Sequence, residues 1–354
     1  MKNILVKAYL VKNFGDDLFL KVLFDRYNKT NWIIDTNDKE YKEIFNKYNN
    51  VNIIKSSFFK ILRKLNLHNI YYRKYDAVIY IGGSIFMQLD IWKKQYKEKV
   101  ILFNLFKDKP KYILGANFGP FKDKVFFEKH RELFNKCKDI CFRDEYSYDL
   151  FKDLENVRMA PDIVFQVKPT YVDKIKNSIG ISLINLKNRD KLSEYNDKYK
   201  NKIKEVVEEL IDNGKLITFF SFCEEEGDKE VIEEILDIID DNYKGLINIE
   251  NYNGNIDEFL SKFERMENII GTRFHACILS QVFSQGLYPL IYSDKTYNVL
   301  SDIGLDKEYL YIKNIEELSS KRILKVINDN KIQDRKICIE AEKHFEVLDN
   351  YINS

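Results

Sequence analysis

Short runs of β-branched and aromatic residues alternate with longer segments of helical periodicity along most of this chain. Strands that alternate with helices in this way form a parallel sheet with helices packed on it. In the first half of the chain the pattern predicts strands at residues 3–9, 32–35, 76–81, 112–116 and 139–143. Each expected strand ends in a polar or glycine-containing turn, so the sequence predicts a doubly wound α/β domain.

The same pattern restarts near residue 178, after a segment that contains Pro169 and mixed charges. Further strands are expected at 178–184, 216–220, 246–249, 268–271 and 288–292, and helices at 202–212, 228–240, 256–263, 274–283 and 297–303. A chain of 354 residues suits two domains. We therefore expect two Rossmann-like domains facing a cleft, over residues 1–168 and 177–325. A helical stretch over 326–354 follows, for which a return to the first domain is one open arrangement.

Composition excludes several classes of protein. Lys plus Arg (57) and Asp plus Glu (56) nearly cancel to +1, so no overall field attracts nucleic acid. The five cysteines form no CxxC pair, which argues against a disulfide framework and a zinc site. No apolar run reaches the length of a signal h-region or a membrane span. We expect a cytoplasmic protein without a metal or a bound cofactor.

Four turns follow expected strands of the first domain, and open α/β sheets bind ligands at the carboxyl ends of their strands. Their candidate ligand-binding residues are Asn13, Gly15, Asp16, Gly82, Gly83, Ser84, Asn117, Gly119 and Arg143. Asp16 is expected to cap a helix, Gly82-Gly83-Ser84 resembles a phosphate-binding nest, and Arg143 binds either a ligand or the neighbouring acids. Each turn alone is also compatible with ordinary packing. We expect the four turns to share one rim of the sheet.

The segment from Ile269 to Ala276 carries the strongest local signal. An apolar strand leads into Gly271, and Arg273 and His275 follow at the start of a helix. A guanidinium binds carboxylate or phosphate in bidentate fashion, and an imidazole exchanges protons near neutral pH. The alternative is a packed histidine beside a solvated arginine. The rim position favours a functional pair, with Phe274 pointing into the core.

Two further strand ends carry candidate residues. Ser221 and Glu226 flank Cys223, whose pKa the nearby acids should raise, so substrate binding or helix capping is preferred to a thiolate nucleophile. Lys295 follows the strand at 288–292 and either holds a phosphate or faces solvent. No complete GxGxxG, HExxH or GxSxG motif is present, so neither a nicotinamide cofactor nor zinc-protease or serine-hydrolase chemistry is inferred.

Taken together, these residues resemble the polysaccharide pyruvyl transferase family. The matching motifs, in chain order, are Asn-Phe-Gly-Asp from Asn13, Asp-Ala-Val-Ile-Tyr-Ile-Gly-Gly-Ser from Asp76, Leu-Gly-Ala-Asn-Phe-Gly-Pro-Phe from Leu114, Phe-Arg-Asp from Phe142, Ala-Pro-Asp from Ala160, Ser-Phe-Cys with Glu-Gly-Asp from Ser221, Arg-Phe-His-Ala from Arg273 and Tyr-Ser-x-Lys from Tyr292. A departure is Ser84, where many members have a third glycine.

The resemblance implies a fold like that of the GT-B glycosyltransferases. It also implies transfer of pyruvate from phosphoenolpyruvate to a sugar of a bacterial surface glycan or its lipid-linked precursor, usually as a cyclic ketal. The positions matching Arg143, Arg273 and His275 would form the phosphoenolpyruvate site. We expect the two arginines to bind the donor's anions and His275 to transfer protons. A lipid-linked acceptor would bring the enzyme to the inner face of the membrane.

Two other functions stay open at the level of sequence. A GT-B nucleotide-sugar glycosyltransferase would use the same pair of domains, because a fold does not determine a function. A non-catalytic protein that binds carbohydrate or anions would also retain this scaffold.

Overall fold

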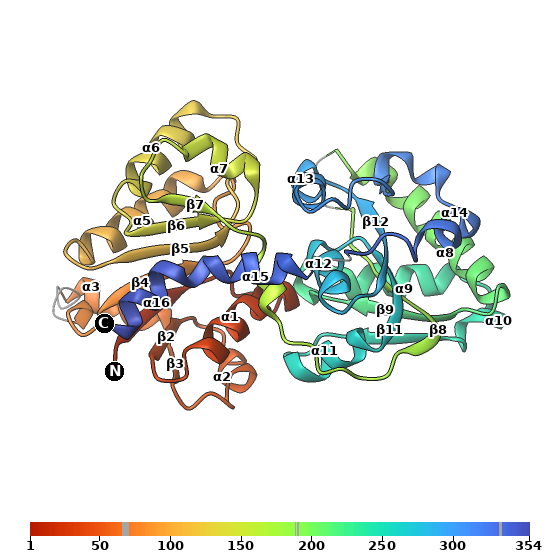
Figure 1. The fold of residues 1–354 in the computed structure, drawn as a ribbon, viewed down its shortest axis with the longest axis horizontal. Helices are drawn as coiled ribbons and strands as arrows, with labels where there is room; N and C mark the ends of the chain where they lie inside the picture. The colour runs from red at the N-terminus through yellow and green to blue at the C-terminus, as the bar shows by residue number, and fades with distance from the viewer. Residues whose placement is uncertain (66–70, 188, 190, 333–334) are drawn as a thin grey trace. The chain divides into compact units, whose positions relative to one another are not determined.

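The protein was analysed as a computed structural model that describes residues 1–65, 71–187, 189, 191–332 and 335–354. It divides into two compact units. The first unit comprises residues 1–10, 19–166 and 339–354, and the second comprises residues 11–18 and 167–338. Each unit contains a parallel sheet with helices around it (Figure 1).

The sheet of the first unit has the order β3-β2-β1-β4-β5-β6-β7, and all of its strand pairs are parallel. Its strands are β1 (Asn3–Lys7), β2 (Asn31–Asp35), β3 (Val51–Ile54), β4 (Ala77–Ile81), β5 (Lys111–Ala116), β6 (Asp139–Phe142) and β7 (Val157–Met159). Its helices are most of α1 (Phe14–Arg26), α2 (Tyr41–Ile44), α3 (Ser56–Lys64), α5 (Trp92–Leu105), α6 (Lys124–Phe134), α7 (Glu145–Phe151) and α16 (Glu346–Asn353). The strand order reverses between β1 and β4, which is where doubly wound sheets bind ligands.

The second unit has a parallel sheet of order β10-β9-β8-β11-β12-β13. Its strands are β8 (Ile175–Ser182), β9 (Leu216–Ser221), β10 (Ile247–Asn251), β11 (Met266–Gly271), β12 (Gly286–Ile291) and β13 (Leu310–Tyr311). Its helices are α8 (Asn196–Asp212), α9 (Asp228–Ile238), α10 (Asp241–Lys244), α11 (Ile256–Glu264), α12 (Phe274–Val282), α13 (Asp294–Asp302), α14 (Ser320–Val326) and the start of α15 (Lys336–Glu342). Short 3-10 turns complete both units.

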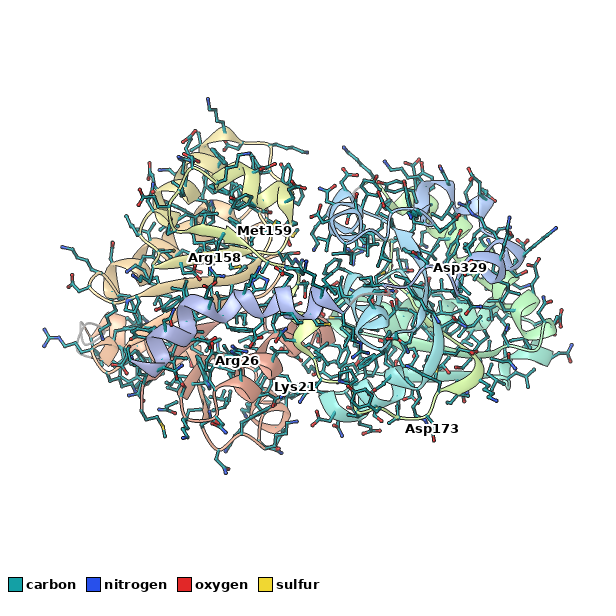
Figure 2. All side chains as sticks on the ribbon, viewed as in Figure 1. Lys21, Arg26, Arg158, Met159, Asp173 and Asp329 are labelled. Atoms are coloured by element: carbon teal, nitrogen blue, oxygen red, sulfur yellow. The ribbon has the colours of Figure 1, made fainter. Side chains whose placement is uncertain are left out.

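The end of the chain packs in the first unit. Asp349 of α16 accepts hydrogen bonds from the guanidinium of Arg26 and, at 2.6 Å, from the hydroxyl of Tyr27. Arg158 of β7 donates to the carbonyl of His344 at 2.8 Å, just before α16. Figure 2 labels both arginines. Two guanidinium groups from separate elements therefore attach the C-terminal segment to the first unit.

The two doubly wound domains expected from the sequence are confirmed, and the expected strands agree with the structure within a few residues. Three short strands were not predicted: β3, β7 and β13. β7 and β13 have three and two residues, and β3 is half-exposed, so none carries a periodic apolar pattern. The C-terminal stretch contains several short helices, and residues 333–334 within it lie outside the described residues.

Candidate active site

In the second unit the turn after β11 is held by one serine. The hydroxyl oxygen of Ser182, at the end of β8, accepts hydrogen bonds from the backbone N–H of Thr272 at 3.0 Å and of Arg273 at 3.2 Å. Helix α12 then begins at Phe274, whose ring is buried as the sequence predicts. His275 follows in the first turn and is only partly buried. The two hydrogen bonds thus fix the backbone from which the side chains of Arg273 and His275 project.

Arg273 is buried between two carboxylates. Its Nε donates to Asp228 Oδ2 at 2.8 Å, its Nη2 donates to Asp228 Oδ1, and its Nη1 donates to Glu226. Asp228 also accepts the backbone N–H groups of Phe222 and Cys223, at 3.0 and 3.1 Å. Such charge-assisted bonds are strong, and a buried pair of this kind fixes the geometry of both partners. The alternative of a solvated Arg273 is wrong.

Charge and burial set the titration of the groups around Arg273. Burial acts to raise the pKa of Glu226, but the charge and hydrogen bond of Arg273, together with Arg189 and Asn13, outweigh this effect and lower the pKa below 4.5. Burial, followed by the charge of Glu226, raises the pKa of the Cys223 thiol to about 12. Cys223 is therefore a neutral thiol at physiological pH, in agreement with the sequence prediction that it is a poor nucleophile.

The Asn13 turn belongs to the second unit. The amide of Asn13 donates to Glu226 at 3.2 Å, and its Oδ1 accepts the backbone N–H of Gly15 at 3.1 Å. Asn13 is therefore the residue that makes this cap contact, whereas Asp16, expected to do so, lies within the first turn of α1. Gly15 packs so closely on His275 that a Cβ at position 15 would lie 1.8 Å from His275 Nδ1.

Phe14 anchors this turn in the second unit. Its buried ring lies 5.3 Å from that of Phe222, 5.1 Å from that of Tyr252 and 4.5 Å from that of Phe259. Its backbone N–H also donates to the carbonyl of Phe222 at 2.9 Å. The ring of Phe14 is therefore part of an aromatic cluster of the second unit, and the expectation that its turn shares one rim with the other three stays a prediction.

Two more cations lie near this group. Arg189 donates to Glu226 at 3.3 Å, and its guanidinium carbon lies 5.0 Å from the ring centre of Tyr292. Lys295, a predicted site residue in α13, has its Nζ 5.7 Å from the ring centre of Phe274. Ser221, also predicted, is buried at the end of β9. Arg189 was not predicted, because it lies in a run of charged and polar residues that resembles a solvated loop.

The other three turns meet in the first unit. Arg143, at the end of β6, donates to Asp162 at 2.7 Å and to the side-chain oxygen of Asn117 at 2.8 Å. A Cβ at Gly83 would lie 2.4 Å from an Arg143 nitrogen, so the glycine permits the guanidinium to pack on its backbone. Arg143 and Asp162 are both almost fully buried. Arg143 forms an ion pair with Asp162, a residue that was not among the partners considered from the sequence.

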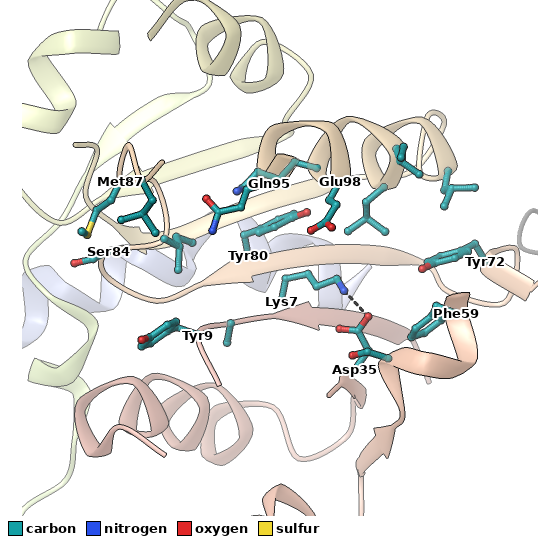
Figure 3. Close-up of a pocket in the computed structure, with 18 residues that line it drawn as sticks. Lys7, Tyr9, Asp35, Phe59, Tyr72, Tyr80, Ser84, Met87, Gln95 and Glu98 are labelled. Atoms are coloured by element: carbon teal, nitrogen blue, oxygen red, sulfur yellow. Dashed lines mark hydrogen bonds and ion pairs between the residues drawn. The ribbon is translucent and has the colours of Figure 1, made fainter. Parts of the chain in front are cut away.

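The remaining predicted residues extend this group in the first unit. Ser84 donates to Asn117 at 3.4 Å, and the Asn117 amide reaches the carbonyl of Gly119 at 3.5 Å. Gly82, with φ of 135°, begins the turn. Ser84 also lines a cavity of about 470 Å³ in the first unit (Figure 3). Arg143 and Arg273 belong to different units, so their shared binding of one ligand stays a prediction.

Two features of the described residues bear on other functions. No group of three or more histidine, cysteine, aspartate or glutamate side chains in the described ranges is arranged to hold a metal ion. No helix in the same ranges combines the length and the apolar character that a membrane span requires.

The lowered pKa of Glu226 leads to a prediction about stability in acid. Because the folded-state pKa is below the ordinary value, the carboxylate stabilises the fold above that value, and this contribution is lost as the pH falls through the folded-state pKa. Glu226→Gln should therefore be less stable than the wild type near neutral pH by about 1–3 kcal/mol. Denaturant unfolding at a series of pH values should show this difference shrinking below pH 4.5.

Glu225→Gln is the matched control, because Glu225 is exposed in the same 3-10 turn. It should unfold like the wild type at every pH. A Glu226→Gln difference that stays constant down to the acid transition would contradict the assignment.

Comparisons with known proteins bear on the fold and the family of this chain. The amylovoran biosynthesis protein AmsJ of Erwinia amylovora is 23% identical over 378 residues, covering 98% of this chain and 87% of AmsJ. UDP-GlcNAc 2-epimerase from Methanocaldococcus jannaschii superimposes with a TM-score of 0.63 at 14% identity, covering 99% of this chain and all of that one. Anabaena Alr3699/HepE in complex with UDP-glucose gives 0.59 at 10% identity, with both chains fully covered.

At these identities the solved structures establish the fold alone, which is GT-B-like as the sequence predicts. The family described as polysaccharide pyruvyl transferase matches residues 13–283, from the Asn13 turn to the end of α12. This span includes Arg143, Glu226, Arg273 and His275. Because the match extends over well more than half of the chain, the protein belongs to the polysaccharide pyruvyl transferase family.

Proposed function

We propose that this protein transfers pyruvate from phosphoenolpyruvate to a sugar of a bacterial surface polysaccharide or its lipid-linked precursor, forming a cyclic ketal. The observation that carries the proposal is the family match, which includes the turn that joins Arg273 to His275. AmsJ, a protein of amylovoran biosynthesis, is similar over nearly the whole chain and supports a polysaccharide as the acceptor.

The charges of the second unit suit an anionic donor. Phosphoenolpyruvate carries a carboxylate and a phosphate, and Arg189, Arg273 and Lys295 supply positive charge within one unit. Asp228 is buried and bonded to two backbone N–H groups, whereas Glu226 is partly exposed. We propose that the donor's anions compete with Glu226 for Arg273, while Asp228 keeps the guanidinium in position.

The reaction requires two proton transfers that an imidazole can perform. Two sugar hydroxyl oxygens form bonds to C2 of phosphoenolpyruvate, the C2–O bond to phosphate breaks, and the methylene carbon becomes a methyl group. One hydroxyl proton goes to that carbon and the other leaves with the phosphate, so the reaction consumes no further reactant. We propose that His275 transfers these protons. Arg143 is proposed to contribute to donor binding, as the resemblance implies.

The proposed donor can be tested against the rival glycosyltransferase reading in one set of assays. The full chain is incubated with phosphoenolpyruvate and a panel of free and lipid-linked glycans, and released phosphate is measured. We expect release only when an acceptor glycan is present, and thermal stabilisation by phosphoenolpyruvate. Stabilisation by UDP-sugars alone, without phosphate release with any glycan, would favour a glycosyltransferase and overturn the proposal.

The role of His275 can be tested without altering the histidine. Alanine is intrinsically better than glycine in a helix, so Gly15→Ala in α1 should not disfavour the helix. Its new methyl group must displace the His275 ring. We expect kcat to fall by about a hundredfold in Gly15→Ala, because misplacing a catalytic group has this order of effect. His275→Ala should lose at least as much, on the order of a hundredfold or more.

Gly245→Ala is the matched control, since a Cβ at Gly245 meets open space and its φ of −70° suits alanine. It should retain wild-type turnover. Full activity in Gly15→Ala and His275→Ala, with both proteins folded by circular dichroism, would exclude the proton-transfer role.

We further propose that the first unit contacts an anionic membrane surface that carries the lipid-linked acceptor. Between Lys55 and Tyr75 the sequence has six lysine and arginine residues and no aspartate or glutamate. In α3, Phe59 and Leu62 are buried, whereas Ile61 on another face is 53% exposed. An exposed apolar face on a basic helix is typical of segments that bind at the surface of anionic membranes.

Sedimentation with lipid vesicles tests the membrane proposal. The protein should bind vesicles that contain phosphatidylglycerol more strongly than pure phosphatidylcholine vesicles, and Ile61→Ser should reduce this binding. Ile339→Ser changes an isoleucine that is 67% exposed elsewhere in the first unit and should leave binding unchanged. Equal binding of both variants, or no binding by the wild type, would exclude this role for α3.

A further inference from the structure

A cavity of about 470 Å³ lies at the carboxyl ends of the central strands of the first unit. Lys7 at the end of β1, Asp35 at the end of β2 and Tyr80 near the end of β4 line it from the sheet (Figure 3). Glu98 and Lys99 of α5 line it from the opposite side. Because the strand order reverses between β1 and β4, the cavity occupies the position at which doubly wound sheets bind ligands.

The charged groups of the cavity balance one another. Lys7 forms an ion pair with Asp35, which Figure 3 marks. The positive charge of Lys99 is balanced by the negative charge of Glu98, its neighbour in the sequence. Burial raises the pKa of Asp35, despite the nearby Lys7, and lowers the pKa of Lys99 to about 8. Both shifts favour the neutral form of the side chain, so neither group adds to a net charge of one sign in the cavity. The cavity therefore provides hydrogen-bond donors and acceptors without a net field for an anion.

Aromatic rings contribute to the apolar part of the lining, beside aliphatic side chains such as Ile85 and Leu102. Tyr9 is 44% exposed, and Tyr80 is mostly buried on β4. The C–H face of a pyranose packs on such rings, while its hydroxyl groups bond to carboxylates and ammonium groups. This combination differs from the second unit, in which Arg189, Arg273 and Lys295 lie near one another.

We propose that this cavity binds a neutral pyranose unit of the acceptor glycan. Asp35 and Glu98 accept hydrogen bonds from its hydroxyl groups, and Tyr9 packs against its ring. The identification of this sugar as an acceptor rests on the proposed function, whereas the binding of a neutral sugar does not. A phosphorylated or nucleotide ligand is disfavoured, because the two lysines are already balanced by Asp35 and Glu98 and leave no excess positive charge to compensate the two or more negative charges of such a ligand.

The test uses ligand-observed NMR on the full chain with methyl glycosides of glucose, galactose and mannose as probes. We expect at least one glycoside to show saturation transfer from the protein. UMP should not displace this glycoside. Glu98→Gln should raise its Kd by about tenfold, the effect of losing one hydrogen bond to a charged acceptor. Tyr9→Ala should weaken glycoside binding by a similar factor. The controls Glu132→Gln and Tyr171→Ala change exposed residues outside the cavity and should leave Kd unchanged.

The outcomes separate this inference from the proposed function, because phosphate release from phosphoenolpyruvate is measured on the same proteins. Failure of all three glycosides to bind, or binding by Tyr9→Ala and Glu98→Gln that is as tight as that of the wild type, overturns the cavity assignment even if phosphate release persists. A wild type that binds a glycoside through these residues but releases no phosphate with any glycan supports the cavity and overturns the proposed function. If the cavity assignment and the proposed function are both correct, Tyr9→Ala should raise the KM for the acceptor and leave the KM for phosphoenolpyruvate unchanged.

Discussion

The geometry of the second unit depends on the buried ion pair between Arg273 and Asp228. It joins the turn after β11 to the start of α9, two segments that are far apart in the sequence. Removing either partner would leave a buried charge without compensation, which costs several kcal/mol in proteins generally. Glu226 extends the pair towards Asn13, and Asn13 in turn holds the backbone against which His275 packs. One guanidinium thus determines where the imidazole lies.

The sequence was sufficient where the signal was local. The strand, glycine and Arg-Phe-His succession around Gly271 predicts both the turn and the burial of Phe274, because these features follow from the order of neighbouring residues. The hydrogen bonds to the distant Ser182 that hold the turn were not predicted. The carboxylate partners were not predicted as such. Asp228 lies 45 residues from Arg273, and Asp162 lies 19 residues from Arg143. Pairings over such distances depend on how strands are ordered in the sheet, which local patterns do not encode.

A similar limit applies to the Asn13 turn and to Arg189. Phe14 follows a strand of the first unit, yet its ring packs with Phe222 and Phe259, more than 200 residues later. Nothing in the residues around Phe14 distinguishes a ring that packs on its own sheet from one that packs in another unit. Arg189 lies between charged and polar residues, so only its contact with Glu226 identifies it.

The return of the C-terminal segment has a consequence for biosynthesis. Residues 339–354 belong to the first unit, although all of residues 167–338 are made before them. During translation the second unit can therefore complete its sheet while the first still lacks α16 and the carboxylate that receives Arg26 and Tyr27. A chain that stops after residue 338 would therefore contain every residue of the second unit but lack residues 339–354 of the first.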